Sequence, residues 1–198
     1  MKVMNLILIL LLTGLFSCQQ TDMQRYTKMV RKERESGKVV NDIYFGISLG
    51  MPSKNFYMHC WDMNKKGMFK DGPGNTCVQY ILDKGELKYP GFMTFYPEFK
   101  DGTIYSLWTK FEYSGWMPEN KKLSADSLLP EVIKLYEKWY PAGNPFMKIV
   151  EKEKAPVWVK LDGNRRILIR RFDDMDVKVD YVDTRREKAE KDKKVTIK

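Results

Sequence analysis

An apolar run at the N-terminus, from Val3 to Phe16, is the feature that most limits what this chain can become. Lys2 precedes the run and Cys18 closes it. A positive residue followed by roughly a dozen apolar residues is typical of a secretion signal, whereas a helix that spans a bilayer needs about 20. An uncleaved anchor or a buried helix is the alternative, which the polar and small residues inside the run disfavour. We therefore expect residues 1–17 to be a signal peptide.

The end of the run, Leu15-Phe16-Ser17-Cys18, resembles the lipobox of bacterial lipoproteins. This resemblance implies that Cys18 becomes the mature N-terminus and carries a diacylglyceryl thioether and an amide-linked acyl chain such as palmitate. One acyl chain gives only marginal membrane binding, and two or more make a stable anchor. The resemblance therefore implies a Gram-negative envelope lipoprotein held by lipid, with the outer membrane and the periplasmic side as the expected place.

Length and charge limit the remaining chain. Removal of residues 1–17 from 198 leaves 181, enough for one domain with a sizeable core. The formal net charge of +9 includes Lys2, so the mature chain carries +8. A basic surface favours anionic partners such as an acidic protein, an anionic glycan or lipid headgroups. Nucleic acid is not an expected partner, because the chain is exported and shows no nucleic-acid-binding motif.

Without Cys18, two cysteines remain, Cys60 and Cys77. An even number of cysteines in an oxidising compartment permits a disulfide, and we predict one between them. A zinc site built from both cysteines and His59 would need a fourth ligand. We expect no metal and no cofactor.

The chain divides into a lipidated tether at 18–42, a folded body at 43–182 and a charged tail at 183–198. The tether is polar and basic, which predicts a solvated linker. Its Met23, Tyr26, Met29 and Val30 also fit a short amphipathic helix attracted to anionic headgroups. The tail is expected to be a frayed helix or disordered.

The first half of the body begins with the apolar residues 43–47, after which Ser53 is placed to cap a helix. On that helix one apolar arc contains Phe56, Tyr57, Cys60, Trp61 and Met63. β-type segments follow at 76–82, 91–99 and 103–113. Asp101-Gly102 predicts a hairpin turn, because glycine tolerates the positive φ of a type I′ turn.

The second half repeats this order. A helix is expected from residue 129 or 130 to 140, ended by Pro141; a start after Ser124 would leave Pro130 to interrupt the hydrogen-bond ladder. Strands are expected at 145–150, 155–161, 165–172 and 176–182, with a turn at Asp162-Gly163. We predict an α+β fold of two tandem helix-plus-antiparallel-strand repeats, about 43–117 and 118–182, with a helix layer on an antiparallel sheet.

Gly50-Met51-Pro52-Ser53, the lipobox and the two helix-plus-sheet units together resemble small outer-membrane-assembly lipoproteins, whose fold is shared with β-lactamase inhibitory proteins. The resemblance covers about residues 43–182. It implies a binding role, in outer-membrane assembly or in inhibition of another protein, without a catalytic site. It carries no contact residue over to this chain.

Catalysis has little support in the residue inventory. His59 is the only histidine, so it is the one residue that could act as the imidazole base of a Ser-His-Asp or Cys-His set, and it lies at the edge of its helical arc. We therefore expect a non-catalytic module. The alternative is a carboxylate- or metal-dependent envelope hydrolase or a glycan-binding lipoprotein. Asp173, Asp174 and Asp176 could ligate calcium, and a glycosidase needs two carboxylates across a cleft.

The hairpin turns predict a binding surface. Two-residue turns would pair Phe95 with Trp108 and Met93 with Lys110 in one hairpin, and Trp158 with Ile167 and Lys160 with Arg165 in the other. The sheet face away from the helices would then carry an aromatic and basic patch consisting of Phe95, Trp108, Lys110, Trp158, Lys160 and Arg171. Such patches mark protein interfaces, and an envelope protein is the expected partner. The alternatives are that this face is core, or is covered by the tether or a second subunit.

Overall fold

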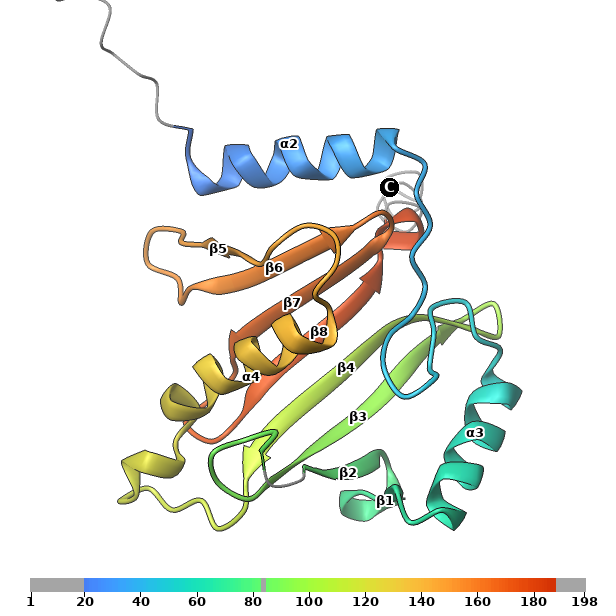
Figure 1. The fold of residues 1–198 in the computed structure, drawn as a ribbon, viewed down its shortest axis with the longest axis vertical. Coiled ribbons are helices and arrows are strands. Elements are labelled where there is room, and N and C mark those ends of the chain that lie inside the picture. Colours follow the sequence, from blue (N-terminus) through green and yellow to red (C-terminus); the bar gives the residue numbers. More distant parts are fainter. Residues whose placement is uncertain (1–19, 83–84, 188–198) are drawn as a thin grey trace, which may run out of the picture.

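The computed structural model describes residues 20–82 and 85–187. The expected signal peptide, Cys18 and the end of the tail lie outside the described residues. The chain forms an α+β fold in which helices pack on one open, eight-stranded antiparallel sheet (Figure 1). Its elements are α2 (Asp22–Glu35), α3 (Ser53–Lys65), β1 (Phe69–Asp71), the 3-10 turn η2 (Pro73–Asn75), β2 (Val78–Leu82), β3 (Gly91–Lys100), β4 (Thr103–Tyr113), the 3-10 turn η3 (Lys121–Leu123), α4 (Ala125–Trp139), β5 (Met147–Ile149), β6 (Val157–Asp162), β7 (Arg165–Arg171) and β8 (Val177–Asp183).

The strand order is β1-β2-β3-β4-β8-β7-β6-β5, so the last strands of the two halves of the chain meet in the middle of the sheet. In the first half α3 precedes β1 to β4, and in the second half α4 precedes β5 to β8. The halves join where β4 pairs with β8 in antiparallel fashion. The free edges of the sheet are therefore β1 and β5, which are three residues each.

Residues Asp22–Glu35 form the helix α2 and not the solvated linker that the polar sequence predicts. A capping box explains where the helix starts: Thr21 Oγ1 accepts from the Gln24 backbone N–H, and Gln24 Oε1 accepts from the Thr21 N–H. The helix is also docked on the body. Asp22 accepts a hydrogen bond from the Val150 backbone N–H at 3.2 Å, and Glu33 accepts one from the Gly163 N–H at 2.7 Å.

The helix α4 begins at Ala125, four or five residues before the predicted start. Pro130 lies inside it, and its missing N–H leaves the carbonyl of Asp126 without the usual helical donor. Burial offsets this loss, because the side chains of Ala125 and Leu128 in the first turns are completely buried. Tyr136 further along packs its ring on Phe111 of β4.

A cluster of tyrosines fills the space between α4 and the sheet. Tyr44 comes from the segment that precedes α3, and its hydroxyl makes a 2.8 Å hydrogen bond with Thr109 Oγ1 on β4. The hydroxyls of Tyr140 and Tyr181 are 2.9 Å apart. Burial raises the pKa of Tyr44 and of Tyr181 well above the ordinary value, so these hydroxyls stay protonated. The cluster fixes the segment at residues 43–49 to the sheet face that α4 covers.

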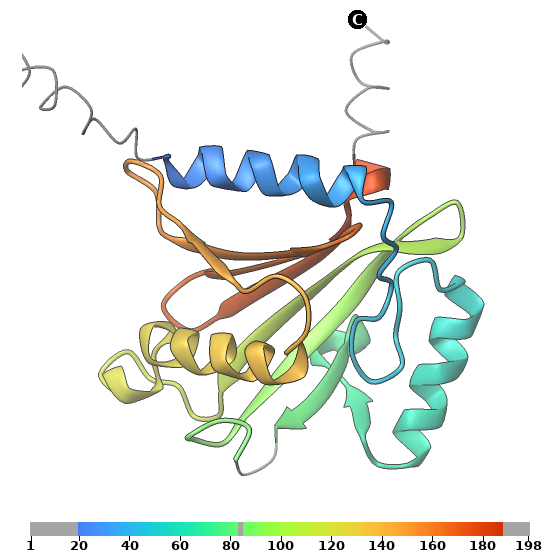
Figure 2. The same ribbon diagram turned by 45° about the horizontal axis from the view of Figure 1, so that its top comes forward.

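The helices α2 and α4 lie on opposite faces of the sheet (Figure 2). Ile167 of β7 points to the buried α4 side, whereas its neighbour Arg166 points to the other side, where its guanidinium reaches the Tyr26 hydroxyl of α2. Val159 and Leu161 on β6 are buried on that same side. The helix α2 lies mainly over β5 and β6, so β7, β8 and β4 keep half-exposed side chains on this face.

Both predicted hairpin registers are wrong. A β-bulge between Glu98 and Phe99 shifts the β3–β4 ladder, so that Phe95 pairs with Thr109 and Tyr96 with Trp108. In the second hairpin Asp162 pairs with Arg165, which places the turn at Gly163 and the residue after it. The strand positions are close to the expected ones, but the bulge reverses the face on which Phe95 lies.

Candidate functional site

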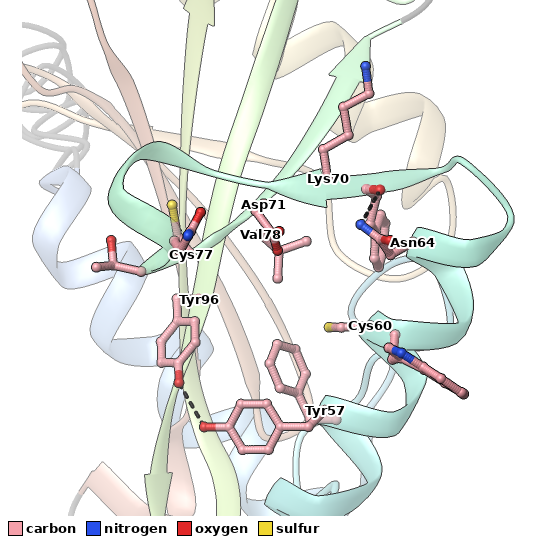
Figure 3. Close-up of a pocket in the computed structure, with 13 residues that line it drawn as sticks. Tyr57, Cys60, Asn64, Lys70, Asp71, Cys77, Val78 and Tyr96 are labelled. Carbon is pink, nitrogen blue, oxygen red and sulfur yellow. Dashed lines mark hydrogen bonds between the residues drawn. The ribbon is translucent and has the colours of Figure 1, made fainter.

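A groove with a volume of about 640 Å³ lies between α3 and the β1–β2 hairpin (Figure 3). The helix α3 supplies one wall, and Asp71, Cys77 and Val78 of the hairpin lie across from it. Tyr96 of β3 closes the remaining side. The groove exists because β2 starts at Val78, opposite Phe95, so that β3 continues past the end of its neighbour.

Aromatic side chains line this groove. Phe56 is buried at its base, with ring contacts to Tyr57 and Tyr96. The hydroxyls of Tyr57 and Tyr96 share a 2.8 Å hydrogen bond across the groove (Figure 3). This hydrogen bond, together with burial, raises the pKa of Tyr96 to about 12. Tyr96 is therefore neutral near pH 7, and the hydroxyls of both tyrosines can act as hydrogen-bond donors and acceptors.

The outer side of α3 exposes large apolar side chains beside the groove. Tyr57, Met58 and Trp61 are 51%, 56% and 61% exposed, and Phe56 is the buried residue of this helix. The ammonium of Lys65 lies 3.3 Å from the centroid of the Trp61 ring, a cation–π contact that fixes the indole. Tyr57 and Trp61 were expected to face the core, so the predicted apolar arc is only partly right.

Cys60 and Cys77 both line the groove, and the structure holds them as free thiols. The Cys77 sulfur is turned toward Gly72, where a Cβ added to the glycine would lie 2.5 Å from it, and so it packs against its own hairpin. Burial raises the pKa of Cys60 to about 12 and also raises the pKa of Cys77. The disulfide between them is not formed in this structure and stays a prediction.

A second surface is the half-exposed sheet face over β4, β8 and β7. Lys110, Lys178 and Arg170 stand opposite one another on the three strands. Lys110 pairs with Asp176 at 2.7 Å, and Phe172 packs under all three cations at 4.6 to 5.8 Å. Trp108 occupies the neighbouring row of the same face. Of the predicted patch, Trp108 and Lys110 therefore do lie on the face away from α4.

The other four residues of the predicted patch lie elsewhere. Phe95 is completely buried, and Trp158, which pairs with Ile169 and not with Ile167, packs against the core on the α4 side. Lys160 is 2% exposed; its ammonium donates to the Ala142 and Asn144 carbonyls and lies 3.4 Å from Asp162. Arg171 is paired with Asp126 of α4 and with Asp174. The structure therefore does not bring the predicted six together on one surface.

The residues considered for catalysis or metal binding have structural roles. His59 Nε2 is 2.7 Å from the Phe45 carbonyl and so holds the turn that precedes α3. Asp173 accepts hydrogen bonds from the backbone N–H groups of Met175 and Asp176. Within residues 20–82 and 85–187, no group of three or more His, Cys, Asp or Glu side chains is placed to hold a metal ion.

Comparisons with known proteins add no further information. A scan against protein-family models, a search of curated proteins and a search of solved structures each find no match. In the part of the chain that the structure describes, no helix has the length and apolar character needed to cross a bilayer. The groove beside α3 is the best candidate site among the described residues. The sequence does not predict this groove, because the apolar arc of α3 indicates that its aromatic side chains face the core.

Proposed function

We propose that this chain is a lipid-anchored, non-catalytic binding protein of the cell envelope, and that the groove beside α3 binds its partner. Cys18 would carry the lipid, as the lipobox-like sequence implies. The observation that carries the proposal is the exposure of Tyr57 and Trp61, which line the aromatic groove, and of Met58, which follows Tyr57 on α3. Tyr, Trp and Met are enriched in the centres of protein interfaces, where they bury a large area at a small entropic cost.

The partner that fits this groove is a segment of another protein with apolar side chains between acidic ones. Lys70 of β1 lines the groove, and α3 with its C-cap carries Lys54, Lys65 and Lys66. Asp62 and Asp71 are the acidic residues of the same elements, so these elements are net positive. A sugar would need a free aromatic face to stack on, and the Lys65 ammonium already occupies one face of Trp61.

The order of elements supports a further part of the proposal. Each half of the chain has one helix followed by four antiparallel strands, and the halves meet at β4 and β8. We propose that the halves are tandem repeats of one unit. In this proposal the short β1–β2 hairpin and α3 of the first unit have diverged to make the groove.

Site-specific photo-crosslinking in intact cells tests the binding site. A photoreactive residue at Met58 should form a discrete protein adduct, and Trp61→Ala should reduce that adduct several-fold. Val150, which is 55% exposed but lies beside α2, is the matched control position. Identical adducts from Met58 and Val150, or adducts indifferent to Trp61→Ala, would contradict the proposed site. Cys18→Ala should move the protein out of the membrane fraction.

A further inference from the structure

The helix α2 separates its charges by face. Two of its three acidic residues, Asp22 and Glu33, are turned to the body by their hydrogen bonds to the backbone N–H groups of Val150 and Gly163. Tyr26, Met29 and Val30 are half-buried against the same body. Three of the four residues of the apolar stripe are therefore covered by the protein itself, whereas Met23 at the start of the helix is 42% exposed.

The outward face of α2 is basic. Four exposed side chains, Lys28, Arg31, Lys32 and Arg34, belong to it, with Arg34 at its margin beside the body, and the exposed Glu35 is the acidic residue on the same face. Among the described residues none of these four forms an ion pair, whereas Arg25 is paired with Asp22. Charge sorting of this kind is not required for docking, because the docking contacts use other side chains.

The position of α2 brings this basic face next to the expected lipid. Only Gln19 and Gln20 separate Cys18 from the N-cap residue Thr21. The helix forms the outermost layer on its side of the molecule, beyond β5 and β6 (Figures 1 and 2). An acyl chain on Cys18 would therefore hold one end of a docked, basic helix within a few residues of the bilayer.

We propose that the outward face of α2 lies on an anionic phospholipid surface and fixes the orientation of the body relative to the membrane. Each Lys or Arg near such a surface raises affinity about fivefold, and the attraction falls off within a Debye length of about 8 Å at physiological salt. Four basic side chains on one short helix would supply several such charges, all within about one Debye length of the surface on which the helix lies. The inference rests on the proposed lipid anchor, which supplies the proximity but not the orientation.

The test uses the lipidated full-length product reconstituted into vesicles of phosphatidylcholine, with or without phosphatidylglycerol. Lysines are labelled with an amine-reactive reagent and quantified by mass spectrometry. Lys28 and Lys32 should react at least about fivefold more slowly in the anionic vesicles. Lys54 and Lys66, on and just after α3, should react equally in both. Equal labelling of Lys28 and Lys32 in both vesicles, or equal slowing of all four lysines, would overturn the inference.

A charge-matched pair of variants separates a membrane contact from general attraction. Arg31→Gln with Arg34→Gln keeps both reporter lysines and every docking contact of α2, and it should abolish most of their protection. Lys54→Gln with Lys66→Gln removes the same charge from the other side of the molecule and should leave the protection intact. Loss of protection in both variants would count against α2. Retention of the protein by neutral vesicles depends on the lipid anchor alone. A missing anchor would therefore abolish retention by both kinds of vesicle, whereas a missing α2 contact would abolish only the protection of Lys28 and Lys32.

Discussion

Alanine at Gly163 is predicted to weaken the docking of the N-terminal segment, whereas alanine at Gly102 is not. Both glycines lie in hairpin turns with positive φ, 57° for Gly163 and 71° for Gly102. A Cβ at Gly102 would meet nothing within 4 Å, but a Cβ at Gly163 would lie 2.3 Å from the backbone oxygen of Lys38. Both variants would therefore have the conformational strain of an alanine with positive φ, but only Gly163→Ala would add a steric clash with Lys38.

The magnitude follows from these contacts. A left-handed alanine costs about 1–2 kcal/mol, and this is the whole loss expected for Gly102→Ala. Backbone overlap at 2.3 Å must be relieved by movement of Lys38 away from the turn, which breaks the 2.7 Å hydrogen bond from the Gly163 N–H to Glu33. A hydrogen bond to a charged group contributes about 1.5–3 kcal/mol. Gly163→Ala is therefore expected to lose about 2.5–5 kcal/mol in all.

Urea unfolding followed by tryptophan fluorescence measures the loss in both variants, and hydrogen exchange of the α2 amides shows where it occurs. If the loss appears as local undocking, the α2 amides of Gly163→Ala exchange faster while the β3–β4 amides keep the wild-type rate. Equal unfolding free energies for the two variants, with equal exchange in α2, would refute the proposed clash and the docking that it reports.

Three shorter predictions concern the core, pH and thiols. Trp158→Ala should lose more unfolding free energy than Trp108→Ala in urea titrations, because Trp158 packs against the core and Trp108 lies on the half-exposed face; equal losses would contradict this placement. At Glu33 burial raises the pKa, but hydrogen bonds from Asn144 and Gly163 outweigh it and hold the pKa below its usual value. The stability that Glu33 contributes is therefore present above about pH 4.3 and lost as pH falls through the lower folded pKa, so the gap in unfolding free energy between wild type and Glu33→Gln should close in acid. Cys60, with a pKa of about 12, should react slowly with iodoacetamide at neutral pH in the native state and rapidly in urea; fast native alkylation would show an open thiol.

Local patterns predict most of the strands and the class of the fold. The strand at Thr103–Tyr113 has the predicted bounds, and Asp101-Gly102 forms the expected turn with positive φ at both residues. The face of the sheet on which each side chain lies depends on β-bulges and on long-range strand pairing, which local sequence patterns do not predict. One bulge at Glu98 reverses Phe95, and the pairing of β4 with β8 sets how the second half lies against the first. Period-2 alternation specifies two faces but not which of them becomes core.

The groove beside α3 could not be predicted from the sequence for a related reason. The α3 sequence places Tyr57 and Trp61 in the same apolar arc as Phe56, and such an arc ordinarily faces the core. The structure gives α3 only a marginal place against β1, so that Phe56 is covered and Trp61 is not. The docking of α2 was equally hidden, because it depends on two backbone N–H groups, at Val150 and Gly163, far along the chain.

The two edge strands have a consequence for crowding. With the proposed lipid anchor, copies of this chain would diffuse in two dimensions and meet in similar orientations, which favours pairing of exposed strand edges. Here each edge strand is three residues long and is guarded by a polar side chain from a helix. Asn64 donates to the Phe69 carbonyl of β1, and Asp22 accepts from the Val150 N–H at the end of β5. Because both edges are short and occupied in this way, many copies of the protein could lie close together on a membrane surface without forming intermolecular β-sheet.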